Sequence, residues 1–248
     1  MIGTLLSDQK RQLAKQREWR DLRSHTRIYR KNSGNIMKLW VLLPLLSSLL
    51  LADYSAKILP ISQGIKKRMI RGRSYRPGCP VPLKDLRYLR MSYRGFDGKD
   101  HTGEMIVHKD VAEEVTRIFG ELYRAKYPIR RMRLVSDYGG SDWRSIEADN
   151  TSAFNCRPAT GSKKWSRHAY GKAIDLNPLE NPYVSRSGRI AHKASLSYRI
   201  RKRKNPFRPE YRAVLLPGDT AVKVFKKRGW RWGGEWRTIK DYQHFDKR

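Results

Sequence analysis

The sequence predicts an α+β fold, with a mainly antiparallel central sheet and flanking helices in one domain. Two observations support this fold class. Short segments typical of β-strands occur at 86–93, 104–108, 132–136 and 173–176, and segments with helical spacing occur at 110–126 and after Asp219. No regular alternation of strand, helix and strand links them, and this absence favours antiparallel pairing over a parallel sheet.

The elements of the first half follow from local patterns. In 86–93 the apolar residues Leu89, Met91 and Tyr93 alternate with polar ones, as in a strand with one buried face. Asp110 is a common helix-capping residue, and the apolar side chains after it fall on one helical face. Pro128 ends that helix. The first half of the domain is therefore expected to combine strands with one amphipathic helix.

The second half contains longer irregular segments. Residues 137–164 are rich in Gly, Ser, Asp and Asn and predict a loop, and 185–212 predict a long basic loop. Asp219 is expected to cap a last helix that ends at Gly229. The final strand or strands are expected within 230–236 and 242–245.

The N-terminal part of the chain predicts export. Residues 39–52 are apolar but span only about 21 Å as a helix, too short for a bilayer core of about 30 Å. They follow a basic stretch, as in a signal peptide, with Met37 as the expected true start. The predicted divisions are a basic extension at 1–36, a signal peptide or membrane anchor at 37–52, a basic linker at 53–76 and a single folded domain at 77–248. A buried core helix at 39–52 remains the alternative.

The net charge restricts the partners. The chain has 54 basic and 23 acidic side chains, a formal charge of +31, and the part after residue 52 alone carries +24. Such a domain attracts polyanions. With export expected, anionic cell-envelope polymers are the predicted partners and nucleic acid is not. The basic run 199–204 is interpreted in the same way, as a solvated loop that faces the envelope.

The two cysteines, Cys79 and Cys156, both follow the apolar segment. An even number of cysteines in an exported domain suggests one disulfide, with two buried free thiols as the alternative. This disulfide would tie the segment after residue 75 to the loop that precedes residue 166.

Two short motifs contain candidate metal ligands. The stretch 166–175 contains His168 and Asp175, and 241–244 contains Asp241 and His244. Two His and one Asp around Zn²⁺ leave a fourth position for water, as in catalytic zinc sites. The spare carboxylate of Asp241 could then take a proton from that water. By spacing alone this signal is weak.

Longer motifs make the signal specific. The strings SRHAYGKAIDLNPLENPY, GWRWGGEW and DYQHF, with GCPV, FDG and FNCR before them, resemble the zinc D-alanyl-D-alanine carboxypeptidases and L-alanyl-D-glutamate endopeptidases over about residues 78–246. Enzymes of this family cut peptidoglycan stem peptides. The resemblance implies an α+β domain with a central antiparallel sheet, one Zn²⁺ per chain and peptidoglycan peptides as substrates.

The resemblance also implies roles for individual residues. His168, Asp175 and His244 would bind the zinc ion, and Asp241 would be the general base, where family members often have Glu. Arg157 would face the substrate carbonyl or the oxyanion, and Ser166 would line the substrate pocket. Alternatives remain open: Asp241 could orient His244, Glu235 could be the base, and Arg157 could be an ordinary surface residue. Trp232, with Trp230 and Trp236, could form a pocket wall or belong to the core.

The function expected from these residues is zinc-dependent hydrolysis of an amide bond in a peptidoglycan stem peptide, outside the cytoplasm. D-Alanyl-D-alanine carboxypeptidase action is the first candidate, and endopeptidase action at L-Ala-D-Glu or a cross-bridge is the second. A non-catalytic envelope-binding module of the same fold is the alternative from another class.

Overall fold

The structure is a computed structural model and describes residues 53–248. The predicted extension 1–36 and the predicted signal peptide or anchor 37–52 lie outside the described residues. Among the helices within 53–248, none has the length and apolar character needed to cross a membrane.

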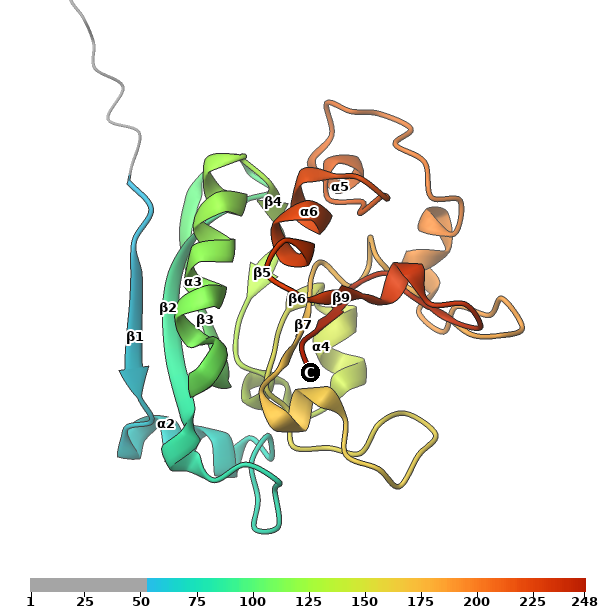
Figure 1. The fold of residues 1–248 in the computed structure, drawn as a ribbon. Coiled ribbons are helices and arrows are strands. Elements are labelled where there is room, and N and C mark those ends of the chain that lie inside the picture. Colours follow the sequence, from blue (N-terminus) through green and yellow to red (C-terminus); the bar gives the residue numbers. More distant parts are fainter. Residues whose placement is uncertain (1–52) are drawn as a thin grey trace, which may run out of the picture. The chain divides into compact units, whose positions relative to one another are not determined.

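The largest sheet is built on a long antiparallel hairpin. Strand β2 (Leu86–Gly95) pairs with β3 (Asp100–His108) along nearly its whole length. Helix α3 (Lys109–Arg124) begins directly after β3 and packs across one face of the hairpin (Figure 1). Its apolar face is buried against the strands because Val115, Ile118 and Leu122 recur at helical spacing. The short strand β4 (Pro128–Ile129) pairs with the end of β2 in parallel.

The prediction that residues 53–76 form a linker is wrong, because this segment folds onto the sheet. Strand β1 (Ala56–Pro60) pairs antiparallel with β2 as an edge strand. Helix α2 (Gln63–Arg71) follows, capped by the Ser62 hydroxyl and anchored by the fully buried Met69. All five side chains of β1 are exposed, so backbone hydrogen bonds rather than burial fix this strand. A strand of this kind has no apolar alternation from which it could be predicted.

A second, three-stranded antiparallel sheet lies in the C-terminal half. Its order is β7 (Ala173–Asp175), β11 (His244–Asp246) and β9 (Arg231–Trp232). Helix α6 (Thr220–Lys226) follows Asp219, as predicted, and contributes Phe225 to the core. The ring of Phe225 stacks on that of Phe245 of β11 with centroids 4.0 Å apart. This contact joins the second sheet to the main apolar core.

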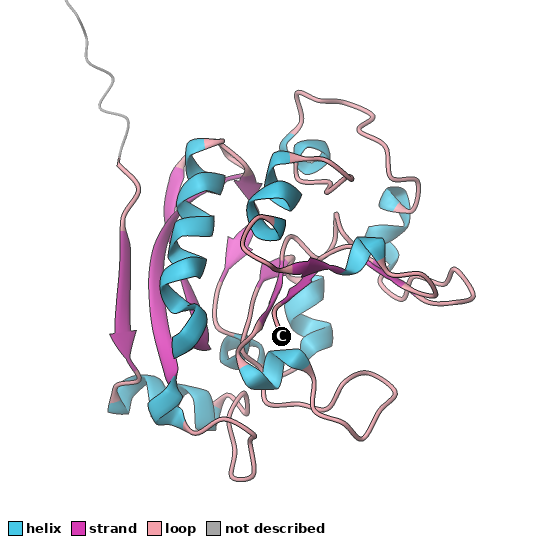
Figure 2. Ribbon diagram, viewed as in Figure 1, coloured by secondary structure: helices cyan, strands magenta, loops and turns pink. Residues whose placement is uncertain are grey.

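Short elements occupy the segments that were predicted as loops. Residues 137–164 contain α4 (Asp142–Glu147) and β6 (Asn150–Thr151), which pairs in parallel with β5 (Arg131–Met132). The connection 185–212 is mostly irregular, as Figure 2 shows. It holds two short helical segments, η4 (Lys193–Tyr198) and α5 (Pro209–Arg212). Strands β8 (Tyr183–Val184) and β10 (Lys240–Asp241) form a separate antiparallel pair.

The other 3-10 segments are η1 (Leu83–Asp85), η2 (Val135–Tyr138), η3 (Arg167–Tyr170) and η5 (Gly233–Glu235). The α+β class with mainly antiparallel pairing is confirmed. The pairing is divided among several small sheets instead of one central sheet.

Candidate active site

Three side chains from distant parts of the chain converge on one point. His168 lies in η3, Asp175 ends β7 and His244 begins β11. His168 Nε2 is 3.1 Å from Asp175 Oδ2, His244 Nδ1 is 3.0 Å from Asp175 Oδ1, and the two nitrogens are 3.2 Å apart. All three residues are buried. The structure therefore brings together the three residues predicted as metal ligands.

Strand register explains why two of these ligands meet. Asp175 and His244 are directly opposite each other in the antiparallel pair of β7 and β11. Residues paired in this way on one face have adjacent side chains. The neighbouring pair, Ile174 and Phe245, is fully buried on the core side. Successive side chains of a strand point to opposite faces, so the candidate metal site and the core lie on opposite sides of this strand pair.

Gly171 brings the third ligand into place. It ends η3 with a left-handed backbone (φ +65°), so the chain turns from His168 directly into β7. A Cβ at this position would lie 2.6 Å from the backbone nitrogen of His108, which donates a hydrogen bond to the Gly171 carbonyl. Only glycine satisfies both the turn and the close approach to β3.

The geometry fits a zinc ion. Ligand atoms about 2.0–2.1 Å from a tetrahedral Zn²⁺ lie about 3.3 Å apart, close to the spacing of these three atoms. His168 Nδ1 is 2.6 Å from the Ala153 carbonyl oxygen, which only accepts hydrogen bonds. Nδ1 therefore carries the proton, and Nε2 presents its lone pair toward Asp175 and His244. Two imidazole nitrogens and one carboxylate form a donor set typical of catalytic zinc.

The pKa values of Asp175 and His244 depend on the charges of their neighbours. Burial alone would raise the pKa of Asp175. When His168 and His244 are protonated, their charges and hydrogen bonds outweigh burial and hold this pKa well below its usual range. Burial opposes protonation of His244, yet the hydrogen bond and charge of Asp175 outweigh this effect and raise its pKa. The carboxylate thus stays ionised and can bind a cation.

Asp241 lies beside this cluster at the start of the last motif. It belongs to β10, opposite Tyr183 of β8, and both residues line the same cavity as the three ligands. Its Oδ1 accepts a hydrogen bond of 3.1 Å from Gln243 Nε2. Burial raises the pKa of Asp241 to about 6, with the charge of Asp175 acting in the same direction and His244 opposing it. A carboxyl group tuned in this way is suited to exchange protons near neutral pH.

The double glycine of the motif GWRWGGEW helps to place Asp241. A Cβ on Gly233 would lie 2.4 Å from the Asp241 carbonyl oxygen and 3.0 Å from its Cβ. A Cβ on Gly234 would collide with the ring of Trp232. The two glycines therefore allow close packing on both sides of the turn, and Gly233 sets the approach of β10 to the cavity.

Arg157 and Ser166 both line the cavity. Arg157 donates a hydrogen bond of 2.6 Å to Asp142 Oδ2 and one to the carbonyl of Pro158. Ser166 caps η3, and its hydroxyl accepts from the backbone N–H of His168. The serine therefore orients the segment that carries the first ligand, besides forming part of the wall.

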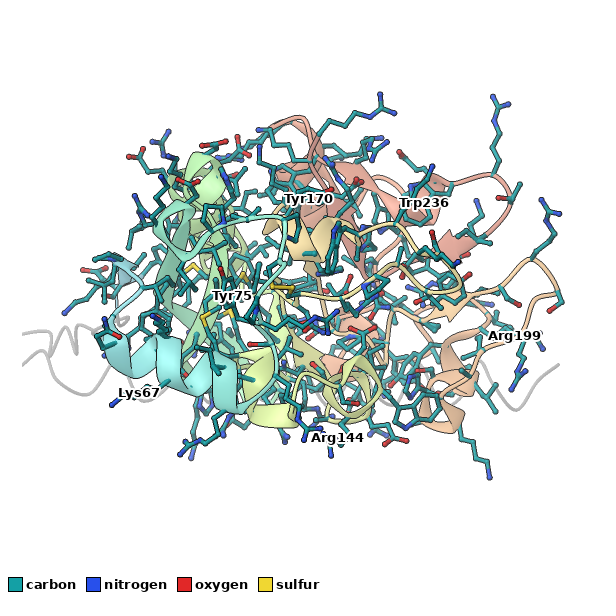
Figure 3. All side chains as sticks on the ribbon, turned by 90° about the horizontal axis from the view of Figure 1, so that it is seen from below. Lys67, Tyr75, Arg144, Tyr170, Arg199 and Trp236 are labelled. Atoms are coloured by element: carbon teal, nitrogen blue, oxygen red, sulfur yellow. A yellow bond between two sulfur atoms is a disulfide. The ribbon has the colours of Figure 1, made fainter. Side chains whose placement is uncertain are left out.

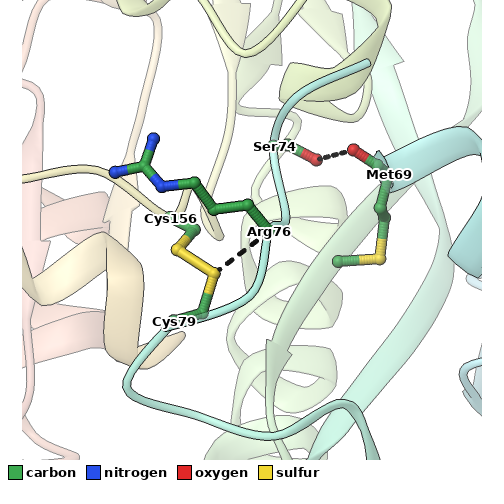
Figure 4. The surroundings of a disulfide bond; sticks show 5 residues. All are labelled: Met69, Ser74, Arg76, Cys79 and Cys156. Atoms are coloured by element: carbon green, nitrogen blue, oxygen red, sulfur yellow. Dashed lines mark hydrogen bonds between the residues drawn. A yellow bond between two sulfur atoms is a disulfide. The ribbon is translucent and has the colours of Figure 1, made fainter. Parts of the chain in front are cut away.

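Cys79 and Cys156 form a disulfide in the structure (Figure 4). Cys156 directly precedes Arg157, and Cys79 Sγ also accepts a hydrogen bond from the backbone N–H of Arg76. The bond joins the segment after α2 to the irregular segment that leads into Arg157, which lines the cavity. It thereby fixes the backbone from which Arg157 extends.

The cavity has a volume of about 590 Å³ and an aromatic wall, of which the sequence offered only Trp236 as a candidate. Trp143 of α4 and His192 face each other with ring centroids 3.9 Å apart. Trp236 packs beside His244, with centroids 5.4 Å apart, and also lines the cavity. Trp143 lies in the predicted loop 137–164, and His192 lies in the predicted basic loop 185–212. No local pattern marked either residue, because they meet only through tertiary contacts.

Two other sequence interpretations are settled by burial. The prediction that Trp232 contacts substrate is wrong: it is 1% exposed, does not line the cavity, and packs in the main core. Its indole N–H donates to the carbonyl of Tyr242. Glu235, the alternative base, pairs with Lys226 and is not among the cavity residues. Of the three tryptophans in this motif, only Trp236 faces the cavity.

Comparison with known proteins agrees with this site. A family model described as D-alanyl-D-alanine carboxypeptidase matches residues 160–247, a segment that contains all three candidate ligands and Asp241. Searches of curated proteins and of solved structures found no match. From residue 160 to residue 247, this chain is therefore similar to the D-alanyl-D-alanine carboxypeptidase family, the one that its motifs resemble.

Proposed function

We propose that this protein is a zinc-dependent D-alanyl-D-alanine carboxypeptidase that acts on peptidoglycan stem peptides. The observation that carries the proposal is the convergence of His168, Asp175 and His244 within one cavity that Asp241 also lines. The family match supports a peptidase, and the donor set supports zinc.

The cavity residues are proposed to have separate roles in hydrolysis. His168, Asp175 and His244 would hold the ion, which when bound polarises a carbonyl group and makes water acidic enough to react near neutral pH. Asp241 would accept the proton of the attacking water and return it to the leaving amine. General-base assistance of this kind contributes roughly 10²–10⁴-fold to the rate.

Arg157 is proposed to stabilise the negative charge that develops on the substrate carbonyl oxygen. A guanidinium stays charged at all relevant pH values, and this one lies on the cavity wall with its orientation held by Asp142. Peptidoglycan lies outside the cytoplasm, so we also propose an exported protein. The +24 charge of the part after residue 52 would hold it near anionic envelope polymers.

Endopeptidase action is the second candidate, favoured by the size of the cavity. A volume of about 590 Å³ is within the range of pockets that enclose drug-sized ligands. The aromatic pair Trp143 and His192 extends the wall beyond the metal ligands. Such a cavity could accommodate peptide on both sides of the scissile bond.

Metal analysis and product analysis test these proposals together. The full chain is expected to hold one zinc ion, to lose activity on chelation and to recover it with added zinc. The variant Asp241→Asn should retain zinc but lose at least about 100-fold in kcat. The matched control Glu235→Gln removes the rival carboxylate and should leave kcat unchanged.

Mass analysis of digested muropeptides then identifies the bond. Free D-alanine indicates carboxypeptidase action, whereas cleavage within the stem or the cross-bridge indicates endopeptidase action. A chain without stoichiometric zinc would refute the metal assignment. A zinc-loaded chain that cuts neither type of bond would instead support a non-catalytic envelope-binding module.

A further inference from the structure

Residues 193–208 form the most basic part of the long connection between the cavity wall and α6. They contain seven Lys and Arg side chains and no acidic residue. Figure 3 shows Arg199 at the outer edge of the molecule, on the side away from Lys67 of α2. The segment is therefore well placed to meet a partner without obstruction from the sheet.

Two of its arginines point inward and hold the segment to the domain. Arg201 donates hydrogen bonds to the carbonyls of Glu180 and Leu215 and to Asn181 Oδ1, and its guanidinium lies over the ring of Tyr242. Arg203 donates to the carbonyl of Val214 and to Asp219 Oδ2. These contacts fix the backbone at both positions.

The inward arginines determine which side chains face solvent. Partly buried Arg201 and Arg203 alternate with exposed Ile200, Lys202 and Lys204, as expected for an extended chain anchored at every second residue. Phe207 and Arg208 follow and are also exposed. We name these outward residues the basic–apolar surface: Arg199, Ile200, Lys202, Lys204, Phe207 and Arg208.

The apolar members of this surface are unusual for a solvated loop. Phe207 is 92% exposed and Ile200 is 69% exposed, the two highest values among the exposed large apolar side chains of residues 53–248. Leu196, at 51%, lies in the same segment. Apolar side chains flanked by Lys and Arg are typical of surfaces that insert into the headgroup region of a bilayer.

We propose that the basic–apolar surface docks on an anionic lipid bilayer, with Phe207 and Ile200 entering the boundary between headgroups and acyl chains. Lys202 and Lys204 complement the negative headgroups, and beside them lie Arg199, which also donates to the Gly188 carbonyl, and Arg208, which also pairs with Glu210. A soluble polyanion or a nucleic acid would engage the same cations but would not remove Phe207 and Ile200 from water. The exposed apolar pair therefore favours lipid over those partners.

A fluorescent label tests where position 207 lies. The only cysteines of the chain form a disulfide, so a polarity-sensitive probe reacts only with the introduced thiol of Phe207→Cys in the full chain. With vesicles of phosphatidylcholine and phosphatidylglycerol, its emission should shift to the blue and be quenched by brominated lipid. Pure phosphatidylcholine vesicles should produce neither effect. The control label, at Ile70→Cys on the exposed side of α2, should not respond.

Vesicle partitioning of unlabelled variants separates charge from insertion. Lys202→Gln with Lys204→Gln should weaken partitioning by about twenty-five-fold, because each basic residue near an anionic surface contributes about fivefold. Ile200→Ser with Phe207→Ser should weaken it by roughly tenfold or more. The control variants Lys67→Gln and Ile70→Ser, which change similar exposed side chains on α2, should have little effect.

The label remains decisive if residues 37–52 also hold the chain to vesicles, since it reports the position of residue 207 alone. A label at 207 that stays in water on anionic vesicles would overturn the proposal. The proposal would also be overturned if the Ile200→Ser, Phe207→Ser variant and the native chain bound equally well, both to vesicles and to soluble polyphosphate. That result would indicate a purely electrostatic contact.

Discussion

The pair of buried carboxyl groups Glu180 and Asp149 provides a quantitative test of the structure. Each residue is only 3% exposed, and Asp149 Oδ2 and Glu180 Oε2 have no hydrogen-bond donor unless one group keeps its proton. Arg130 Nε is 3.7 Å from Asp149 Oδ2, too far for a hydrogen bond. Burial raises the pKa of Glu180 from 4.5 to about 10, with the charge of Asp149 adding to the effect. Burial likewise raises the pKa of Asp149.

The sign of the pH dependence follows from this shift. The folded state holds the Glu180 proton more tightly than the unfolded state, so its contribution to stability is complete below pH 4.5 and is lost as the pH rises toward about 10. Within that window one proton is released on unfolding. The free energy of unfolding should therefore fall by about 1.4 kcal/mol per pH unit from this group. Between about pH 5.5 and about pH 8.5 the loss is about 4 kcal/mol.

The variant Glu180→Gln should remove this slope, since an amide cannot ionise and can still donate a hydrogen bond to Asp149. Urea unfolding of both proteins across that pH range gives the difference directly, because all other titrating groups are shared. Glu147→Gln, an exposed control on α4, should follow the native curve. If Glu180→Gln and the native chain lose stability with parallel slopes, Glu180 is ionised in the folded protein and the reasoning fails.

Three further changes test the scaffold of the candidate site. Replacing Cys79 and Cys156 together by Ser opens a loop closed over 77 residues and should lower the free energy of unfolding by about 4 kcal/mol, measured in urea; an unchanged midpoint would contradict this. Gly171→Ala forces a left-handed backbone on a residue with no room for a Cβ, and should cost about 1–3 kcal/mol and weaken zinc binding in a metal titration. Gly233→Ala should displace Asp241 and lower kcat while leaving zinc affinity intact. Equal loss of both properties would mean that Gly233 supports the whole site.

The sequence predicted those elements whose burial follows a local period. The alternation around Leu89 and Met91 and the helical stripe of α3 are both core patterns, so they could be recognised without tertiary information. The edge strand β1 could not, because none of its side chains is buried. The short elements α4 and β6 are fixed by tertiary contacts, including the pairing of Asn150 with Arg131 on a separate strand.

The candidate site was predictable to a similar extent. His168, Asp175 and His244 lie within recognisable motifs, and the structure brings them together. The assignment of Trp232 failed because a tryptophan-rich motif gives no sign of which ring faces the core. The aromatic pair Trp143 and His192 depends on contact between α4 and the long connection, and neither segment has a local pattern that indicates this contact.

The three-residue strand β11 has a consequence for when the protein can act. His244 faces the candidate metal site, and the next residue, Phe245, fills the core. A slip of one residue in the pairing with β7 would exchange their sides, removing a ligand and burying an imidazole in place of a phenyl ring. Molecules with this strand unpaired or misaligned would lack the metal site altogether. The proposed hydrolysis would therefore be restricted to molecules that have finished folding.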